Sequence, residues 1–126
     1  MAVSLWVALG SAIGGLLRHW VGVWAAAVAG AAFPWGTLGI NAAGSFVIGL
    51  VGAGIAARGW DGGPVDLRAF VMVGVCGGFT TFSSFSLQTL ELLQAGRHPA
   101  ALAYTGASVL LCLTATWAGA ALARGW

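Results

Sequence analysis

Near the middle of its third apolar segment the chain reads Gly74-Val75-Cys76-Gly77-Gly78-Phe79-Thr80-Thr81-Phe82-Ser83-Ser84-Phe85-Ser86. Two adjacent glycines, two threonines and three serines specify the i→i−4 backbone ladder of a helix poorly. Within a lipid bilayer, irregular backbone is tolerated only where protein or a watery cavity surrounds it. Carbonyl and hydroxyl oxygens released there are the ligands that a buried ion needs. The run therefore predicts a broken helix and an ion site.

The composition places this run in a membrane protein. Of the 126 residues, 60% are hydrophobic and only 6% are charged, and the mean hydropathy is +0.94. Soluble domains carry roughly a quarter of their residues charged. We therefore expect an all-α, multi-pass protein of the cell (plasma or inner) membrane, with a single domain over residues 1–126. The five arginines lie at segment edges and there is no lysine, so the chain has no footprint for nucleic-acid binding.

Four apolar segments are long enough to cross a bilayer, which takes about 20 residues each. They cover residues 3–28, 36–57, 69–94 and 100–123, and residues 58–68 form the main loop. Cys76 and Cys112 lie inside these segments without metal-ligand spacing, so we interpret them as inert thiols. The sequence offers no nucleophile–base or metal constellation, which argues against an enzyme.

The first two spans each carry one conspicuous polar residue. Arg18 either extends to a membrane interface or faces a protein interior. Asn41 is the only strongly polar side chain of the second span, and an amide in hydrocarbon needs a partner. Asn41 therefore points at another helix or at a pore, and bare chemistry favours the helix. The first span also has a face of small residues, Gly10 and Gly14, that lets another helix approach closely.

Helical spacing beyond the break predicts an aromatic stripe beside a polar one. The aromatic face carries Phe82, Phe85 and Thr89. The adjacent face carries Thr81, Ser84, Gln88 and Glu91. On the fourth span, Tyr104, Ser108 and Cys112 share one face. Periodicity alone favours ordinary packing for the aromatic residues, and hydroxyls in membrane helices often bond their own backbone.

The distribution of arginines favours neither direction of membrane insertion strongly. Four spans put both termini and the main loop on one side of the membrane. That side holds Arg58, Arg68 and Arg124, and the other holds Arg97 and, if it reaches the interface, Arg18. Because arginine bias sets orientation, a difference this small predicts insertion both ways. Four short helices are also few to enclose a selective pathway, so we expect an antiparallel homodimer of oppositely oriented copies.

Three motifs resemble those of the fluoride-specific channel family known as Fluc or CrcB. Residues 77–86, Gly-Gly-Phe-Thr-Thr-Phe-Ser-Ser-Phe-Ser, resemble its signature, and residues 36–46 are similar to its second-span hallmark. Residues 14–18, Gly-Gly-Leu-Leu-Arg, resemble its first-span arginine motif. The resemblance spans nearly the whole chain, with four spans in the same order. It implies passive fluoride efflux that lowers cytoplasmic fluoride and its toxicity.

The resemblance also implies a dual-topology antiparallel homodimer with two pores and a central sodium ion. By motif position, the backbone carbonyls of Gly77 and Thr80 from each subunit would hold this Na⁺. A hard cation suits oxygen ligands, and carbonyls add no negative charge beside an anion path. We expect the ion to be structural and not transported.

For the fluoride path, the resemblance implies the two phenylalanines after the break, Phe82 and Phe85. An aromatic ring edge is positive and can face an anion without trapping it. Asn41 would supply an amide donor, and the polar track would comprise Ser83, Ser84, Tyr104 and Ser108. Gln88 stands where the family usually has Glu, and Glu91 follows one turn later. We assign Arg18, Gln88 and Glu91 to the pore vicinity or vestibule.

Two other functions compete with this interpretation. A small dual-topology multidrug or cation exporter also has about four spans, but it needs a titratable carboxylate within the membrane, usually in the first span. The first span here has no acidic residue. A non-conducting assembly subunit held together by glycine faces would not need the run Gly-Gly-Phe-Thr-Thr.

Overall fold

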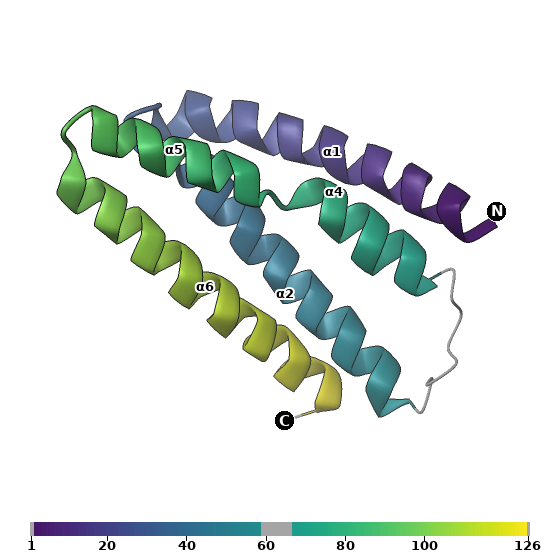
Figure 1. Cartoon of the computed structure of the whole chain (residues 1–126). Coiled ribbons are helices and arrows are strands. Elements are labelled where there is room, and N and C mark those ends of the chain that lie inside the picture. The colour runs from purple at the N-terminus through teal and green to yellow at the C-terminus, as the bar shows by residue number, and fades with distance from the viewer. Residues whose placement is uncertain (1, 59–66, 126) are drawn as a thin grey trace.

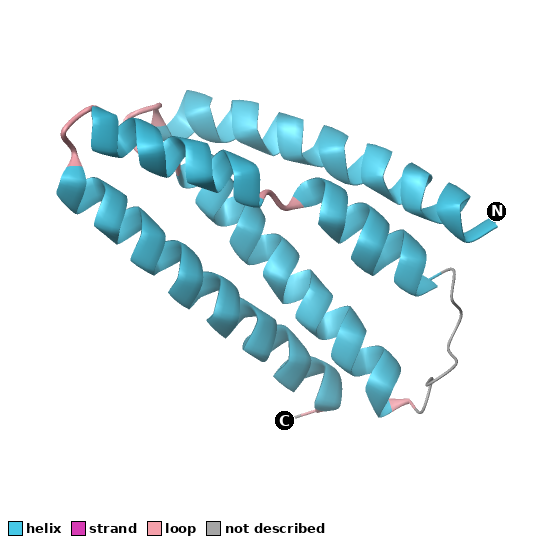
Figure 2. Ribbon diagram, viewed as in Figure 1, coloured by secondary structure: helices cyan, strands magenta, loops and turns pink. Residues whose placement is uncertain are grey.

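The computed structural model describes residues 2–58 and 67–125, and this part of the chain is helical and connected by turns (Figures 1 and 2). The predicted loop residues 59–66 lie outside the described residues. The elements are α1 (Ala2–Ala29), α2 (Trp35–Ala57), η1 (Arg68–Cys76), α4 (Gly77–Phe79), α5 (Phe82–Gln94) and α6 (His98–Arg124). The segment η1 is a π-type helix that continues into α4.

Four helices are long and apolar enough to cross a membrane: Ala2–Ala29, Trp35–Ala57, Arg68–Gln94 and His98–Arg124. The prediction of an all-α, four-span, multi-pass membrane protein is therefore confirmed. Both termini lie at the same end of the bundle (Figure 1). The last span begins at His98, two residues before the predicted start, because Pro99 fits in the first turn of a helix.

Helices that are consecutive in the chain are not the principal packing partners. Helix α2 packs mainly along α6, and α1 packs mainly along η1 and α4. Figure 1 shows these two pairs, with α1 running beside the third span and α2 beside α6. The bundle is therefore interleaved, with spans one and three paired and spans two and four paired.

Glycines make both pairings close. A Cβ atom built on Gly10 would lie 2.4 Å from the Phe70 carbonyl oxygen, and one on Gly14 would lie 2.2 Å from that of Val75. The small-residue face predicted on the first span is thus in contact with the third. In the other pair, a Cβ on Gly49 would lie 2.2 Å from the Thr116 carbonyl oxygen. Small residues let membrane helices gain van der Waals contact where lipid provides no hydrophobic driving force.

The buried core is small and lies at the α5–α6 end of the bundle. Its main hydrophobic cluster comprises Leu38, Leu92, Ala101 and Tyr104, and further buried apolar residues lie along the helices. Many large apolar side chains face outward, as expected of a surface that meets lipid or another protein in the membrane. At this end Gly96 has a positive φ of 71° in the turn before α6. The Arg97 guanidinium next to it donates to the Ala32 carbonyl and ties this turn to the α1–α2 connection.

Candidate functional site

Two extended residues interrupt the third span. Helix α4 ends at Phe79, Thr80 has φ −79° and ψ 159°, Thr81 has φ −154° and ψ 114°, and α5 begins at Phe82. The helix continues through the two glycines, since Gly77 has φ −64° and ψ −39°. Within the run that the sequence predicted to be weakly helical, the interruption therefore falls at the two threonines, and the glycine pair stays helical.

The glycine pair has a packing role instead. A Cβ on Gly78 would lie 2.5 Å from the Ser11 carbonyl oxygen, so the glycine allows α1 to approach α4. Gly77 has open space around its Cβ position.

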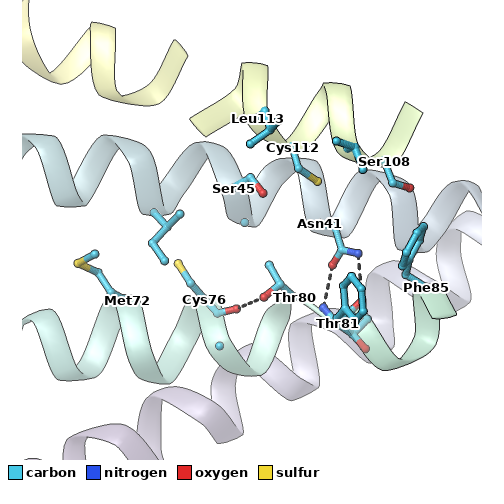
Figure 3. Close-up of a pocket in the computed structure, with 15 residues that line it drawn as sticks. Asn41, Ser45, Met72, Cys76, Thr80, Thr81, Phe85, Ser108, Cys112 and Leu113 are labelled. Atoms are coloured by element: carbon cyan, nitrogen blue, oxygen red, sulfur yellow. Dashed lines mark hydrogen bonds between the residues drawn. The ribbon is translucent and has the colours of Figure 1, made fainter. Parts of the chain in front are cut away.

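Asn41 of α2 holds the interruption from across the bundle. The Thr81 backbone N–H donates to Asn41 Oδ1 at 2.7 Å, and Asn41 Nδ2 donates to the Thr81 carbonyl at 3.0 Å (Figure 3). This pair of bonds satisfies both backbone groups of an extended residue that has no helical partners. Asn41 is thus in contact with another span, and one N–H of its amide is left over.

The hydroxyl of Thr81 caps the next helix. Thr81 Oγ1 accepts from the Ser84 N–H at 3.2 Å, and it also lies 3.0 Å from Ser84 Oγ and 3.2 Å from Ser83 Oγ. A threonine at this position satisfies one of the orphan N–H groups at a helix start. The Thr80 hydroxyl turns back along α4 and donates to the Cys76 carbonyl at 2.8 Å (Figure 3). Thr81 was predicted only for the polar stripe and not for the site, although a threonine just before a helix start is a cap signal.

Arg18 reaches the same place from α1. Its Nη1 lies 3.4 Å from the Thr80 carbonyl oxygen, and the side chain is half-buried. Of the two alternatives left open by the sequence, the structure favours the protein interior. A fixed positive charge therefore lies beside the extended residues of the third span.

A cavity of about 490 Å³ lies between α2, the third span and α6 (Figure 3). Six of the residues predicted for the site line it: Asn41, Gly77, Thr80, Phe82, Phe85 and Ser108. Ser108 is only 7% exposed, and its Oγ has no hydrogen-bond partner among residues 2–58 and 67–125. Because a buried hydroxyl without a partner is unfavourable, Ser108 is a donor available to an occupant of the cavity. Gly44 and Ser45 also line the wall and were not predicted.

The aromatic residues form a connected series. The ring centroids of Phe82 and Phe85 are 5.3 Å apart, and those of Phe85 and Tyr104 are 5.2 Å apart. Phe82 is 78% exposed, whereas Tyr104 is fully buried. The series therefore runs from the outer surface of the chain into its core.

A second cavity, of about 380 Å³, lies at the α5–α6 end and includes Gln88, Glu91 and Arg97 in its wall. The Tyr104 hydroxyl donates to Gln88 Oε1 at 2.8 Å. Tyr104 thus connects the aromatic series to the second cavity, although it lines neither of the two cavities. Ten of the twelve predicted residues fall into three groups: the wall of the first cavity, the cap formed by Ser83 and Ser84 with Thr81, and the second cavity with Gln88 and Glu91. Arg18 and Tyr104 lie outside these groups.

These features define an all-helical, multi-pass membrane protein with polar groups and an interrupted span beside an intramembrane cavity. Residues 5–120 match the family model described as CrcB-like protein, Camphor Resistance (CrcB). The chain belongs to this CrcB family.

Curated relatives cover almost the whole chain. A protein of Paramagnetospirillum magneticum named fluoride-specific ion channel FluC is 54% identical over 113 residues, covering 90% of this chain and 88% of the relative. Proteins of the same name from Methylocella silvestris and Rhizobium leguminosarum bv. trifolii are 50% and 48% identical, covering 91% and 98% of this chain and 88% and 98% of the relatives. These relatives are named as ion channels and not as enzymes, in agreement with the sequence prediction.

Proposed function

We propose that this protein is a fluoride-selective channel through which fluoride leaves the cytoplasm passively across the plasma membrane. The observation that carries the proposal is the intramembrane cavity, whose wall combines the Asn41 amide, the unpartnered Ser108 hydroxyl and two phenyl rings. The names of relatives about half identical in sequence support the choice of ion. Passive efflux would lower cytoplasmic fluoride and its toxicity.

The cavity chemistry suits a small, strongly hydrated anion. Passage requires donors that replace the ion's water while binding weakly enough to release it. Ser108 and the remaining N–H of Asn41 are neutral donors, and the edges of Phe82 and Phe85 are electropositive. Ser83, Ser84 and Tyr104 extend this polar track. Arg18, Gln88 and Glu91 belong to the pore vicinity or vestibule.

The complete pathway requires a second copy in inverted orientation. Phe82 is proposed to line the path, yet its side chain is 78% exposed in a single chain. A single chain therefore leaves that side of the path without a wall. An antiparallel homodimer would supply the missing wall twice and give two pores. The outward-facing apolar side chains of the bundle support burial against another protein or lipid.

A structural Na⁺ would lie between the two copies, and the interruption of the third span fits it. In a continuous helix, the Thr81 and Ser84 N–H groups would bond to the carbonyls of Gly77 and Thr80. Here both N–H groups bond to side chains instead, so these carbonyls are released from the helical ladder, and the Thr80 carbonyl keeps only its 3.4 Å contact with Arg18 Nη1 among the described residues. Na⁺ would lie between the protomers, where four such carbonyl oxygens, two from each copy, would surround its positive charge. The ion would not be transported.

Reconstituted flux tests the function. Liposomes loaded with fluoride or with chloride and containing the purified protein should release fluoride and retain chloride, as measured with ion-selective electrodes. Phe82→Ile should lower the fluoride rate without dissociating the dimer. Equal release of both halides, or of neither, would overturn the proposal. Proton-coupled export of an organic cation without fluoride flux would point to the exporter.

A further inference from the structure

We infer that Asn41 and Thr81 are positioning residues for the sodium site. Each releases one of the backbone carbonyls of that site from helical hydrogen bonding. The Asn41 side chain holds the N–H that would otherwise bond to Gly77, and the Thr81 hydroxyl holds the N–H that would otherwise bond to Thr80. The inference rests on the proposed sodium site. In this role the two side chains act on the backbone carbonyls and do not contact the cation, although both line the proposed fluoride path.

The first part of the arrangement is the amide pair between two spans. Asn41 Oδ1 accepts the Thr81 N–H at 2.7 Å, while Asn41 Nδ2 donates to the carbonyl of the same residue at 3.0 Å. These two hydrogen bonds hold the two peptide groups that flank Thr81 against α2, and Thr81 has an extended backbone. The Thr81 N–H is therefore unavailable to the Gly77 carbonyl one turn earlier.

The second part is the helix cap within the third span. Thr81 Oγ1 accepts the Ser84 N–H at 3.2 Å, and Thr81 is only 8% exposed. Because water has little access to this cap, replacing Thr81 Oγ1 as the acceptor would cost free energy. As long as the cap persists, the Ser84 N–H stays away from the Thr80 carbonyl.

Removing either acceptor leaves a buried N–H group without a partner. In a continuous helix, the acceptor for each N–H is the carbonyl four residues earlier, which is the carbonyl proposed to bind Na⁺. Closing the helical ladder would satisfy the N–H and consume the cation ligand. The two side chains are therefore expected to set sodium affinity without contacting the ion, as residues behind metal ligands do.

The test measures how sodium stabilises the purified full-length protein in detergent. The unfolding temperature is recorded as Na⁺ replaces N-methyl-D-glucamine at constant ionic strength. Thr81→Val keeps the shape of the side chain and removes the acceptor, so its half-maximal stabilisation should require about 10- to 100-fold more Na⁺ than wild type. Thr81→Ser keeps the hydroxyl and should retain the wild-type sodium dependence.

An independent pair of variants tests the other side chain, and it carries the test alone if Thr81→Val does not fold. Asn41→Leu removes the acceptor for the Thr81 N–H and should weaken sodium stabilisation in the same way. Asn41→Asp keeps the oxygen acceptor but loses the donor to the Thr81 carbonyl, so it should weaken sodium stabilisation less than Asn41→Leu does. Thr89→Val is the control for loss of a hydroxyl in the same helix, since Thr89 Oγ1 bonds only to the Phe85 carbonyl.

The outcomes separate the inference from the proposed function. If Na⁺ stabilises the wild type while Thr81→Val and Asn41→Leu respond to Na⁺ as the wild type does, the inference is wrong and the sodium site stands. If Na⁺ does not stabilise the wild type more than N-methyl-D-glucamine does, both the sodium site and the inference are overturned. Fluoride flux is measured separately and decides the channel function alone.

Discussion

At the scale of single residues, Ser108 differs from the other hydroxyls of the membrane-spanning helices. Thr89, Thr114 and Thr116 each donate to a carbonyl of their own helix, as hydroxyls in such helices commonly do. Ser108 is buried and has no partner in the part of the chain that the structure describes. This hydroxyl therefore adds no hydrogen bond to the described part of the fold.

Ser108→Ala should separate stability from conduction. Removing a buried unpaired hydroxyl relieves a desolvation cost of about 1–3 kcal/mol, so the unfolding temperature should stay the same or rise. Fluoride release from liposomes should fall, because the path loses a donor. A lower unfolding temperature together with normal flux would show that Ser108 serves the fold instead.

At the scale of elements, the contact between α1 and the third span depends on glycines facing backbone. Gly14 and Gly15 are adjacent, yet only Gly14 lies in the contact: its Cβ would meet the Val75 carbonyl oxygen at 2.2 Å, whereas Gly15 has nothing within 4 Å. Alanine substitutions at these two neighbouring positions are therefore expected to have opposite effects on stability.

Gly14→Ala should destabilise the protein by about 1–3 kcal/mol, because the added methyl group meets backbone that cannot rotate away. Gly15→Ala should be neutral or stabilising by up to about 1 kcal/mol, since alanine favours helix over glycine. Unfolding temperatures of the two variants in detergent compare the effects directly. Equal temperatures would mean that α1 does not pack on this face.

Helix α2 makes a similar contact with the interruption itself. A Cβ on Gly44 would lie 2.2 Å from Thr80 Cγ2, whereas Gly39 of the same helix has open space. The Thr80 side chain is fixed by its bond to the Cys76 carbonyl, so it cannot turn aside freely. Gly44 therefore allows α2 to come close enough for Asn41 to hold Thr81.

Gly44→Ala should displace Thr80 and lower both the unfolding temperature and the fluoride flux, with a stability cost of about 1–3 kcal/mol. Gly39→Ala is the control and should change neither by a comparable amount. Thermal unfolding and liposome flux measured on the same preparations make the comparison. Normal flux in Gly44→Ala would show that the path tolerates movement of Thr80.

At the scale of the whole molecule, the arginines remain nearly balanced. Arg58, Arg68 and Arg124 lie at the end that carries the termini, and Arg97 lies at the other. Arg18 counts toward neither end, because its guanidinium reaches Thr80 inside the bundle. The two ends of the bundle differ by two positive charges, which is only a weak determinant of membrane orientation.

Both orientations should therefore occur in one membrane. A protease-cleavable C-terminal tag should be cleaved in part in sealed right-side-out vesicles and in part in inverted ones, because neither orientation is strongly preferred. A fused single-orientation membrane protein provides the sealing control. Complete cleavage in only one kind of vesicle would rule out the antiparallel homodimer.

The sequence was most informative where composition and spacing act locally. The long apolar runs predicted the four spans, and Gly10 and Gly14 predicted the close face of the first span, because these properties need no partner to be recognised. The exact position of the interruption was not predictable from the glycine pair. It depends on Asn41 and Thr81, which are 40 residues apart and meet only when α2 packs beside the third span. The same holds for Arg18, whose direction was left open until Thr80 lay beside it.

The interleaved pairing of the helices bears on how the chain is made. Spans one and three pack together, as do spans two and four, so each of the first two spans is synthesised before its principal partner exists. The glycine face of α2 stays uncovered until α6 leaves the ribosome. A chain that stops early thus exposes backbone-lined grooves to lipid, and we expect membrane proteases to degrade it rapidly. Quality control can in this way distinguish an unfinished polypeptide from a finished one by the last helix alone.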